Sequence, residues 1–161
     1  MKLSDTFKVT TPGELEIVMA RDFDAPPDMI FDALTRPELV RRWLLGPDGW
    51  IMSVCEIDLK VGGAWRYVWR HEEKDCEFGM HGEYREIDRP ERIVHTEFFR
   101  EGESLVTSNI TAKGDTTTLT MTMRFASRAE RDAALETGMA DGVAVSYDRL
   151  DEVLVPAASR K

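Results

Sequence analysis

His95 and Glu97 are the residues of this sequence best suited to proton transfer, because they lie two positions apart in RIVHTEFF, residues 92–99. Side chains two residues apart in a β-strand share a face. An imidazole and a carboxylate on one face can act as general acid and general base. A structural role for both is the alternative. The sequence leaves open whether the face of His95 or that of Thr96 points inward.

No other pattern in the sequence indicates catalysis or metal binding. The three histidines have no partner at metal-site spacing, and neither HExxH nor CxxC occurs. GxSxG is absent, and no glycine-rich loop opens a helix that could hold a phosphate. We therefore predict no metal and no cofactor. An enzyme of cyclase, dehydratase or hydrolase type remains the second hypothesis.

Aromatic and methionine side chains alternate with polar ones in several strand-like segments, among them AWRYVWR, residues 64–70, and TLTMTMRF, residues 118–125. Methionine is flexible and occurs often on surfaces that adapt to varied apolar partners. An ordinary hydrophobic core is the alternative for each residue, but the joint pattern favours a cavity. The predicted cavity residues are Trp43, Trp50, Trp65, Tyr67, Trp69, Phe78, Met80, Met121, Met123, Met139, Val143 and Tyr147.

The elements that position these residues can be read from the periodicity of the sequence. Proline at a first helical position predicts a short helix from Pro27 and another from Pro37, which Gly46 ends. Alternating runs predict seven strands, at residues 14–23, 50–57, 64–70, 76–87, 92–99, 104–113 and 117–125.

A capping box at Ser127–Glu130 predicts one long helix that continues until Pro156. Its apolar stripe is Leu135, Met139, Val143, Tyr147, Leu150 and Leu154. Small residues recur beside this stripe at Gly138 and Gly142, either for close approach of a strand or to leave volume for a ligand.

This order of elements predicts an α+β helix-grip fold, in which a curled antiparallel seven-stranded sheet surrounds the long C-terminal helix. A sheet that curls around a helix tends to leave space between them. The loop LLGPDGW, residues 44–50, with Trp43 before it and Trp50 at its end, would then close one mouth of that space.

Length and charge limit the classes of partner. At 161 residues the chain is expected to form a single domain, with its core at about residues 14–155. The formal net charge of −9 argues against nucleic acid and anionic membranes as partners. Without a signal or spanning segment, a cytoplasmic protein with reduced Cys55 and Cys76 is expected. Whether it forms a homodimer stays open.

Five motifs resemble, in their order along the chain, the activator of heat-shock-protein-90 ATPase homologue family. They are APPDMIFDALTRPELVRRWLLGPDGW, EIDLKVGGAWRY, GMHGEYREIDRPERIVHTEFF, GDTTTLTMTM and GMADGVAVSYDRLDEVL. That family belongs to the START-related SRPBCC superfamily of helix-grip folds, and the resemblance covers about residues 14–155. The matching positions are Trp43, Asp58, Gly62, Gly63, Gly82, Pro90 and Gly142.

The resemblance implies a cavity between the sheet and the C-terminal helix, which the superfamily uses for lipids, polyketides and other apolar molecules. Binding of a small apolar or aromatic molecule, without covalent chemistry, is therefore the leading hypothesis. Two departures matter. Family members commonly have tryptophan after the helix glycine, where Val143 here would enlarge the pocket. The eukaryotic cochaperone that gives the family its name also has an N-terminal chaperone-binding domain, for which this chain has no room. A chaperone partner is therefore not expected. A cochaperone-like interaction module that acts through its surface is the third hypothesis.

Overall fold

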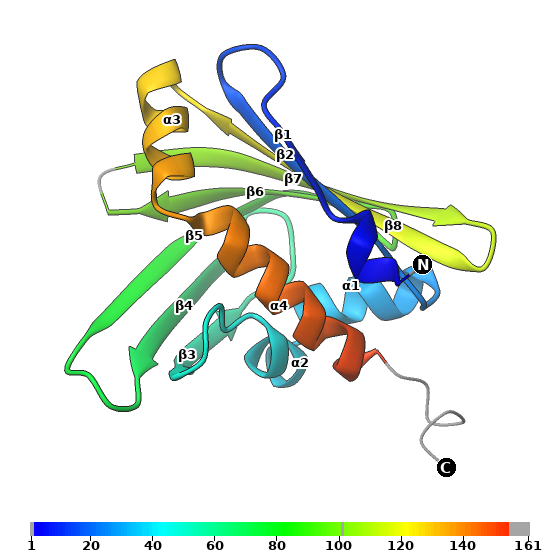
Figure 1. The fold of residues 1–161 in the computed structure, drawn as a ribbon, viewed down its shortest axis with the longest axis horizontal. Helices are drawn as coiled ribbons and strands as arrows, with labels where there is room; N and C mark the ends of the chain where they lie inside the picture. The colour runs from blue at the N-terminus through cyan, green and yellow to red at the C-terminus, as the bar shows by residue number, and fades with distance from the viewer. Residues whose placement is uncertain (1, 101, 155–161) are drawn as a thin grey trace.

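An antiparallel sheet of eight strands curls around helix α4 (Met139–Val153) in the computed structural model, which describes residues 2–100 and 102–154 (Figure 1). The elements before α4 are η1 (Leu3–Thr6), β1 (Lys8–Thr10), β2 (Glu16–Phe23), α1 (Pro27–Thr35), α2 (Pro37–Trp43), β3 (Trp50–Ile57), β4 (Ala64–His71), β5 (Glu77–Asp88), β6 (Arg92–Phe99), β7 (Gly102–Lys113), β8 (Thr116–Phe125) and α3 (Arg128–Glu136).

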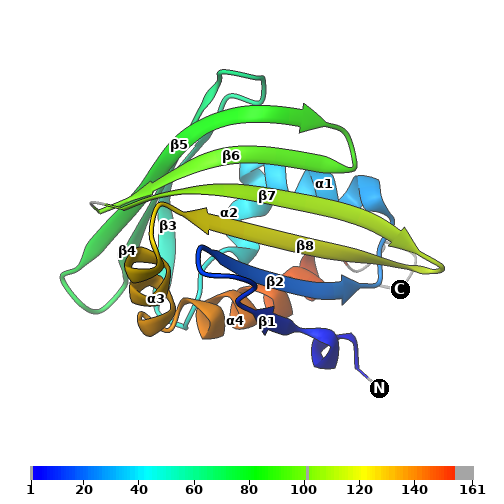
Figure 2. The ribbon, with the colours of Figure 1, turned by 90° about the horizontal axis from the view of Figure 1, so that it is seen from above.

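The strand order β1-β2-β8-β7-β6-β5-β4-β3 makes β1 and β3 the two edges of the sheet. Strands β5 to β8 run side by side as one curved layer (Figure 2). The chain crosses from β2 to the far edge through α1 and α2, and α2 packs against α4. We call the side of the sheet that faces α4 the inner face. On β2 it carries Ile17, Met19, Arg21 and Phe23, all buried.

The structure has one strand more than the predicted seven. The additional strand, β1, pairs with β2 through Lys8 opposite Ala20, and all three of its residues are exposed. An exposed strand has no alternation between buried and solvated positions, so the pattern used to predict strands has nothing to detect there.

The prediction of one long C-terminal helix was wrong, because α3 and α4 are separate helices. Gly138 lies between them with a φ of 80°, a left-handed conformation that glycine adopts without strain. The Gly138 N–H donates to the Leu135 carbonyl, which closes the end of α3. Gly138 therefore ends a helix and is not part of a stripe of small residues. The predicted end at Pro156 lies outside the described residues.

The other local predictions for helix starts were confirmed. Pro27 and Pro37 occupy the first turns of α1 and α2. The Ser127 hydroxyl accepts the Glu130 N–H at 3.2 Å, as the capping box requires. Buried Arg131 then connects α3 to the sheet by donating to the Glu16 carbonyl at 3.1 Å.

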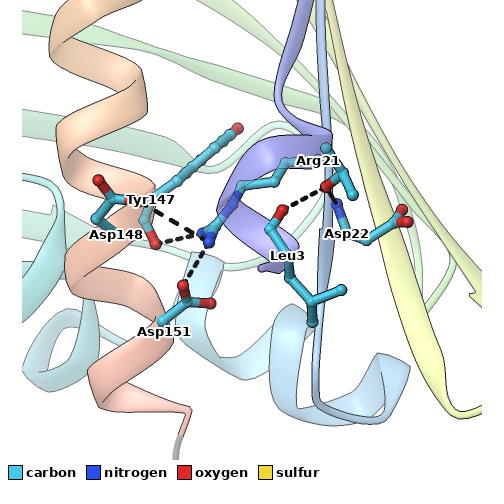
Figure 3. Close-up of polar contacts among 7 residues, drawn as sticks. Leu3, Arg21, Asp22, Tyr147, Asp148 and Asp151 are labelled. Carbon is cyan, nitrogen blue, oxygen red and sulfur yellow. Dashed lines mark hydrogen bonds and ion pairs between the residues drawn. The ribbon is translucent and has the colours of Figure 1, made fainter. Parts of the chain in front are cut away.

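Arg21 connects α4 to the inner face of the sheet and is 1% exposed (Figure 3). Guanidinium Nη1 donates to the Tyr147 carbonyl at 2.7 Å and Nη2 donates to the Asp151 carboxylate, while buried Nε has no hydrogen-bond partner among the described residues. Asp148 lies 3.8 Å away. Because Arg21 is on β2 and its partners are on α4, these contacts hold the helix at one position over the sheet.

Replacement of Arg21 by methionine should therefore loosen α4. We expect Arg21→Met to lower the free energy of unfolding by about 3 kcal/mol, since it removes a buried charged group and leaves its partners unpaired. Denaturant unfolding measures the loss, and hydrogen exchange should show reduced protection in α4. Arg124→Met is the matched control, because exposed Arg124 faces Glu16 at 3.7 Å and should change stability by less than about 1 kcal/mol. Equal losses in both variants would contradict a tethering role.

Candidate functional site

The strand register decides which face of β6 points inward. Tyr84 on β5 lies opposite His95, and Val106 on β7 lies on its other side. Val106 also lies opposite Met123, which packs with Ile17 on the inner face. His95 and Glu97 therefore both lie on the inner face, together with Ile93 and Phe99.

Small residues flank Glu97 on both neighbouring strands. Ser104 lies opposite it on β7, and the register places Gly82 opposite it on β5. A Cβ on Gly82 would come within 1.8 Å of the Thr96 carbonyl oxygen and 2.7 Å of Trp65 Nε1. The absence of a side chain at Gly82 thus allows the Trp65 indole to lie against the sheet, where its N–H donates to the Thr96 carbonyl at 3.1 Å.

His95 is held among aromatic rings. Its ring centroid lies 5.2 Å from Trp65 and 6.1 Å from Tyr84, both in edge-on geometry. Nδ1 is buried and has no hydrogen-bond partner within residues 2–100 and 102–154. Burial lowers the pKa of His95 to about 4, so the imidazole is neutral at physiological pH.

Glu97 is half-buried, and its carboxylate has neither a hydrogen bond nor an ion pair with any residue that the structure describes. Burial raises the pKa of Glu97 to about 7, which lies near physiological pH. Burial likewise raises the pKa of Tyr67 and Tyr84, so both phenols keep their protons. The inner face around Glu97 is therefore polar but carries no fixed positive charge from these groups.

Four predicted cavity residues form a continuous aromatic wall beside His95 and Glu97. The wall consists of Trp65, Tyr67, Trp69 and Phe78. Trp65 lies 4.7 Å from Tyr67 between ring centroids, and Tyr67 lies 5.8 Å from Trp69. Phe78 stacks on Trp69 at 5.0 Å. Half-buried Met80, opposite Tyr67, packs against two of the core clusters. The aromatic face predicted for residues 64–70 thus lies on the inner face.

The remaining methionines form a second group near the middle of the sheet. Met123 is buried, and Met121 and Met139 are half-buried in the same cluster. Val143 on α4 contacts both this group and the cluster that contains Trp65 and Tyr84. A Cβ on the adjacent residue Gly142 would have no atom within 4 Å. Close approach of a strand therefore does not explain why this position is a glycine.

The two tryptophans that flank the loop of residues 44–49 have different surroundings. Trp43 is 3% exposed, its N–H donates to the Ala33 carbonyl at 2.8 Å, and its ring centroid lies 6.0 Å from that of Tyr147. Trp50 is half-buried and packs edge-on against Phe78 at 5.1 Å. Trp43 is thus part of the closed core, whereas Trp50 continues the aromatic wall. Contact of either with a ligand remains a prediction.

Helix α4 and the sheet both hold this loop. The Ser146 hydroxyl accepts the Gly46 N–H at 2.9 Å, and Arg149 donates to the Gly46 carbonyl and to Asp48. The Trp69 N–H donates to the Leu44 carbonyl at 2.7 Å. Such contacts suit a loop that covers one end of the space under α4.

Two open surface hollows lie away from this region. One, of about 500 Å³, is formed by residues 70–77, and the other, of about 430 Å³, by residues 12–16 and Arg124. Neither is lined by a predicted cavity residue. Neither hollow is therefore the predicted cavity, which stays a prediction.

Two residues beside His95 and Glu97, Tyr84 and Ser104, were absent from the predicted site. Tyr84 continues the alternation of Phe78 and Met80, so the same pattern contained the signal for it. Ser104 gave no signal, because only the pairing of β6 with β7 places it beside Glu97.

Comparison with family models matches residues 24–155 to the family described as Activator of Hsp90 ATPase homolog 1-like protein. The match covers more than half of the chain. The chain belongs to this family. The resemblance inferred from the motifs is thus confirmed.

Several solved structures are similar to this chain. A protein from Rhodobacter sphaeroides is 30% identical, with a TM-score of 0.86 over 92% of this chain and 97% of that chain. A protein from Chromobacterium violaceum is 25% identical, with a TM-score of 0.77 over 88% and 98%. An AHSA1-like protein from Aeromonas hydrophila, at 14% identity and a TM-score of 0.71 over 84% and 92%, shares the fold. A search of curated proteins finds no match.

Two further observations concern membrane-spanning helices and the cysteines. Within the described ranges, no helix is long and apolar enough to cross a membrane. Cys55 and Cys76 are free thiols, the first buried and the second exposed.

The raised pKa of Glu97 predicts a pH-dependent stability. Because the folded-state pKa of about 7 exceeds the ordinary 4.5, ionisation of Glu97 opposes folding increasingly as pH rises from 4.5 to 7. Glu97→Gln cannot ionise, so at pH 8 its free energy of unfolding should exceed that of the unaltered protein by up to about 3 kcal/mol. At pH 4.5 the two should nearly agree. Urea unfolding at both pH values measures this.

Glu103→Gln provides the control, because Glu103 is exposed on the adjacent strand and carries the same charge. It should show no pH-dependent gain. A gain for Glu97→Gln of equal size at both pH values would contradict a desolvated carboxyl.

Proposed function

We propose that this protein binds a small apolar or aromatic molecule between α4 and the inner face of the sheet, without covalent chemistry. The observation that carries the proposal is the combination of the aromatic wall with polar groups that have no partner among residues 2–100 and 102–154. Buried polar groups in folded proteins are nearly always hydrogen-bonded. His95 Nδ1 departs from that rule, and the half-buried Glu97 carboxylate on the same face also lacks a partner.

The surroundings of α4 add support. Gly142 has open space where a Cβ would lie, and half-buried Val143 beside it has a much smaller side chain than the tryptophan common in the family. Methionines on the opposite strands can adapt their shape to an apolar guest. The open position beside Gly142 and the adaptable methionines therefore support a ligand site under α4.

Catalysis is the second candidate, favoured by one observation. His95 and Glu97 lie together on the inner face, and a carboxyl whose pKa is about 7 can both accept and donate a proton near neutral pH. A turnover that Glu97→Gln and His95→Gln both abolish, while ligand affinity stays unchanged, would favour the enzyme over the binding protein.

Ligand binding is tested first by identifying what the protein retains. Native mass spectrometry of protein purified from its own host should show an adduct of small-molecule mass. A panel of fatty and aromatic compounds should quench tryptophan emission, and the quench should diminish in Trp65→Phe and Trp69→Phe because these rings form the wall. Trp43→Phe is the control, because the Trp43 N–H donates to the Ala33 carbonyl of α1 and its ring packs against Tyr147 rather than in the aromatic wall. No adduct and unchanged emission across the panel would refute the proposal.

Val143→Trp tests where the ligand lies. If free volume surrounds Val143, the indole will fill it, so the melting temperature should stay the same or rise while bulky ligands no longer bind. In a fully packed core the same change would cost about 1 to 3 kcal/mol. Calorimetry with ligand titration measures both effects. Val145→Trp, at an exposed position of α4, should alter neither, and a strongly destabilised Val143→Trp would show that the region is closely packed.

A further inference from the structure

Glu97 differs from the half-buried carboxylates of Asp22, Asp32 and Asp151 in having no cation beside it among the described residues. Asp22 lies 3.3 Å from Lys113, Asp32 lies 3.0 Å from Arg89, and Asp151 pairs with buried Arg21. At these three positions, then, the fold supplies an arginine or lysine to a half-buried carboxylate. For Glu97 the described residues supply none, although burial raises the pKa of its carboxyl.

The groups around Glu97 cannot provide that charge. The titratable side chains on the inner face are His95 of β6, Tyr84 of β5, Tyr67 of β4 and Cys55 of β3, all uncharged at neutral pH. Ser104 faces Glu97 from β7, and α4 brings Tyr147, whose phenol is likewise uncharged. Arg100, the cation that follows β6, is exposed and stacks on the Phe99 ring at 4.9 Å. Arg21 is occupied by its own partners.

The aromatic wall supplies the other half of a cation site. The Trp65 indole lies over Gly82 beside Glu97. The Tyr67 ring centroid lies 4.7 Å from that of Trp65. Electron-rich ring faces attract organic cations, most strongly where water is excluded. A formal net charge of −9 also favours the approach of cations over anions.

We propose that the molecule bound under α4 carries a protonated amine, whose ammonium group pairs with the Glu97 carboxylate while its apolar body lies against Trp65 and Tyr67. This inference rests on the proposed function and specifies its ligand class. The buried Nδ1 of His95 offers a second, uncharged contact on the same strand face. A neutral ligand that accepts a hydrogen bond from protonated Glu97 is the competing chemistry, and the two have opposite pH dependence.

Three probes of nearly equal shape separate these chemistries: phenylbutylamine, phenylbutanol and phenylbutyrate. In isothermal titration calorimetry at pH 8, the amine should bind at least about tenfold more tightly than the alcohol, and the acid most weakly. Glu97→Gln should weaken amine binding by at least about tenfold and leave the alcohol unaffected. Glu103→Gln, which removes an exposed carboxylate from the next strand, should change none of the three affinities.

The pH profile provides an independent measure. Amine affinity should rise severalfold between pH 6 and pH 8, because Glu97 becomes ionised across its pKa of about 7 while an alkylamine stays protonated. Alcohol affinity should stay flat or fall over that range, and Glu97→Gln should abolish the rise.

Several other outcomes would refute the inference of a cation site. Equal affinities for amine and alcohol, tightest binding of the acid, or an unchanged amine affinity in Glu97→Gln would refute a cation site while leaving the binding function intact. If none of the three probes binds, the amine proposal falls. The binding function falls with it only if native mass spectrometry and the wider ligand panel are also negative.

Discussion

The ion pair between Arg21 and Asp151 is the interaction on which the rest of the inner face depends. It joins the second strand of the sheet to the last turns of α4, two segments separated by most of the chain. Since α4 crosses the curled sheet, its position determines how much volume remains beneath it. A buried guanidinium is costly to desolvate, and here a carbonyl and a carboxylate offset that cost together. The fold thus fixes its principal helix with directional contacts in addition to apolar packing.

A second constraint acts on the sheet itself. Gly82 can approach the Thr96 carbonyl and the Trp65 indole only because it has no Cβ. Its place on β5 therefore determines both how the indole lies and that no side chain opposes Glu97 from β5. Backbone packing and site chemistry are coupled at this residue, because any larger residue would push the indole away from the sheet and crowd the carboxylate at the same time.

Much of this arrangement could be predicted from periodicity, and the failures have specific physical causes. The faces of β4, β5 and β8 were evident because apolar and polar residues alternate there. Strand β6 could not be oriented, since Val94 and Phe98 on one face are as apolar as Ile93 and Phe99 on the other; only the pairing of His95 with Tyr84 decides it. The apolar stripe from Leu135 to Leu154 concealed the break at Gly138, because the stripe continues across it. The partners of Arg21 lie 126 and 130 residues away, a separation that local patterns do not report.

The break at Gly138 also affects how such a protein can diversify. Each of the two helices has its own arginine anchor: Arg131 holds α3 to the first residue of β2, and Arg21 holds α4. The left-handed glycine between them interrupts the helical backbone, and side chains such as Leu135 and Met139 pack together across the break. A substitution that tilts α4 is therefore not transmitted to α3 along a continuous helical backbone, although their shared packing must adjust. A lineage can in this way change the position of α4 over the sheet while the arginine anchor of α3 stays the same.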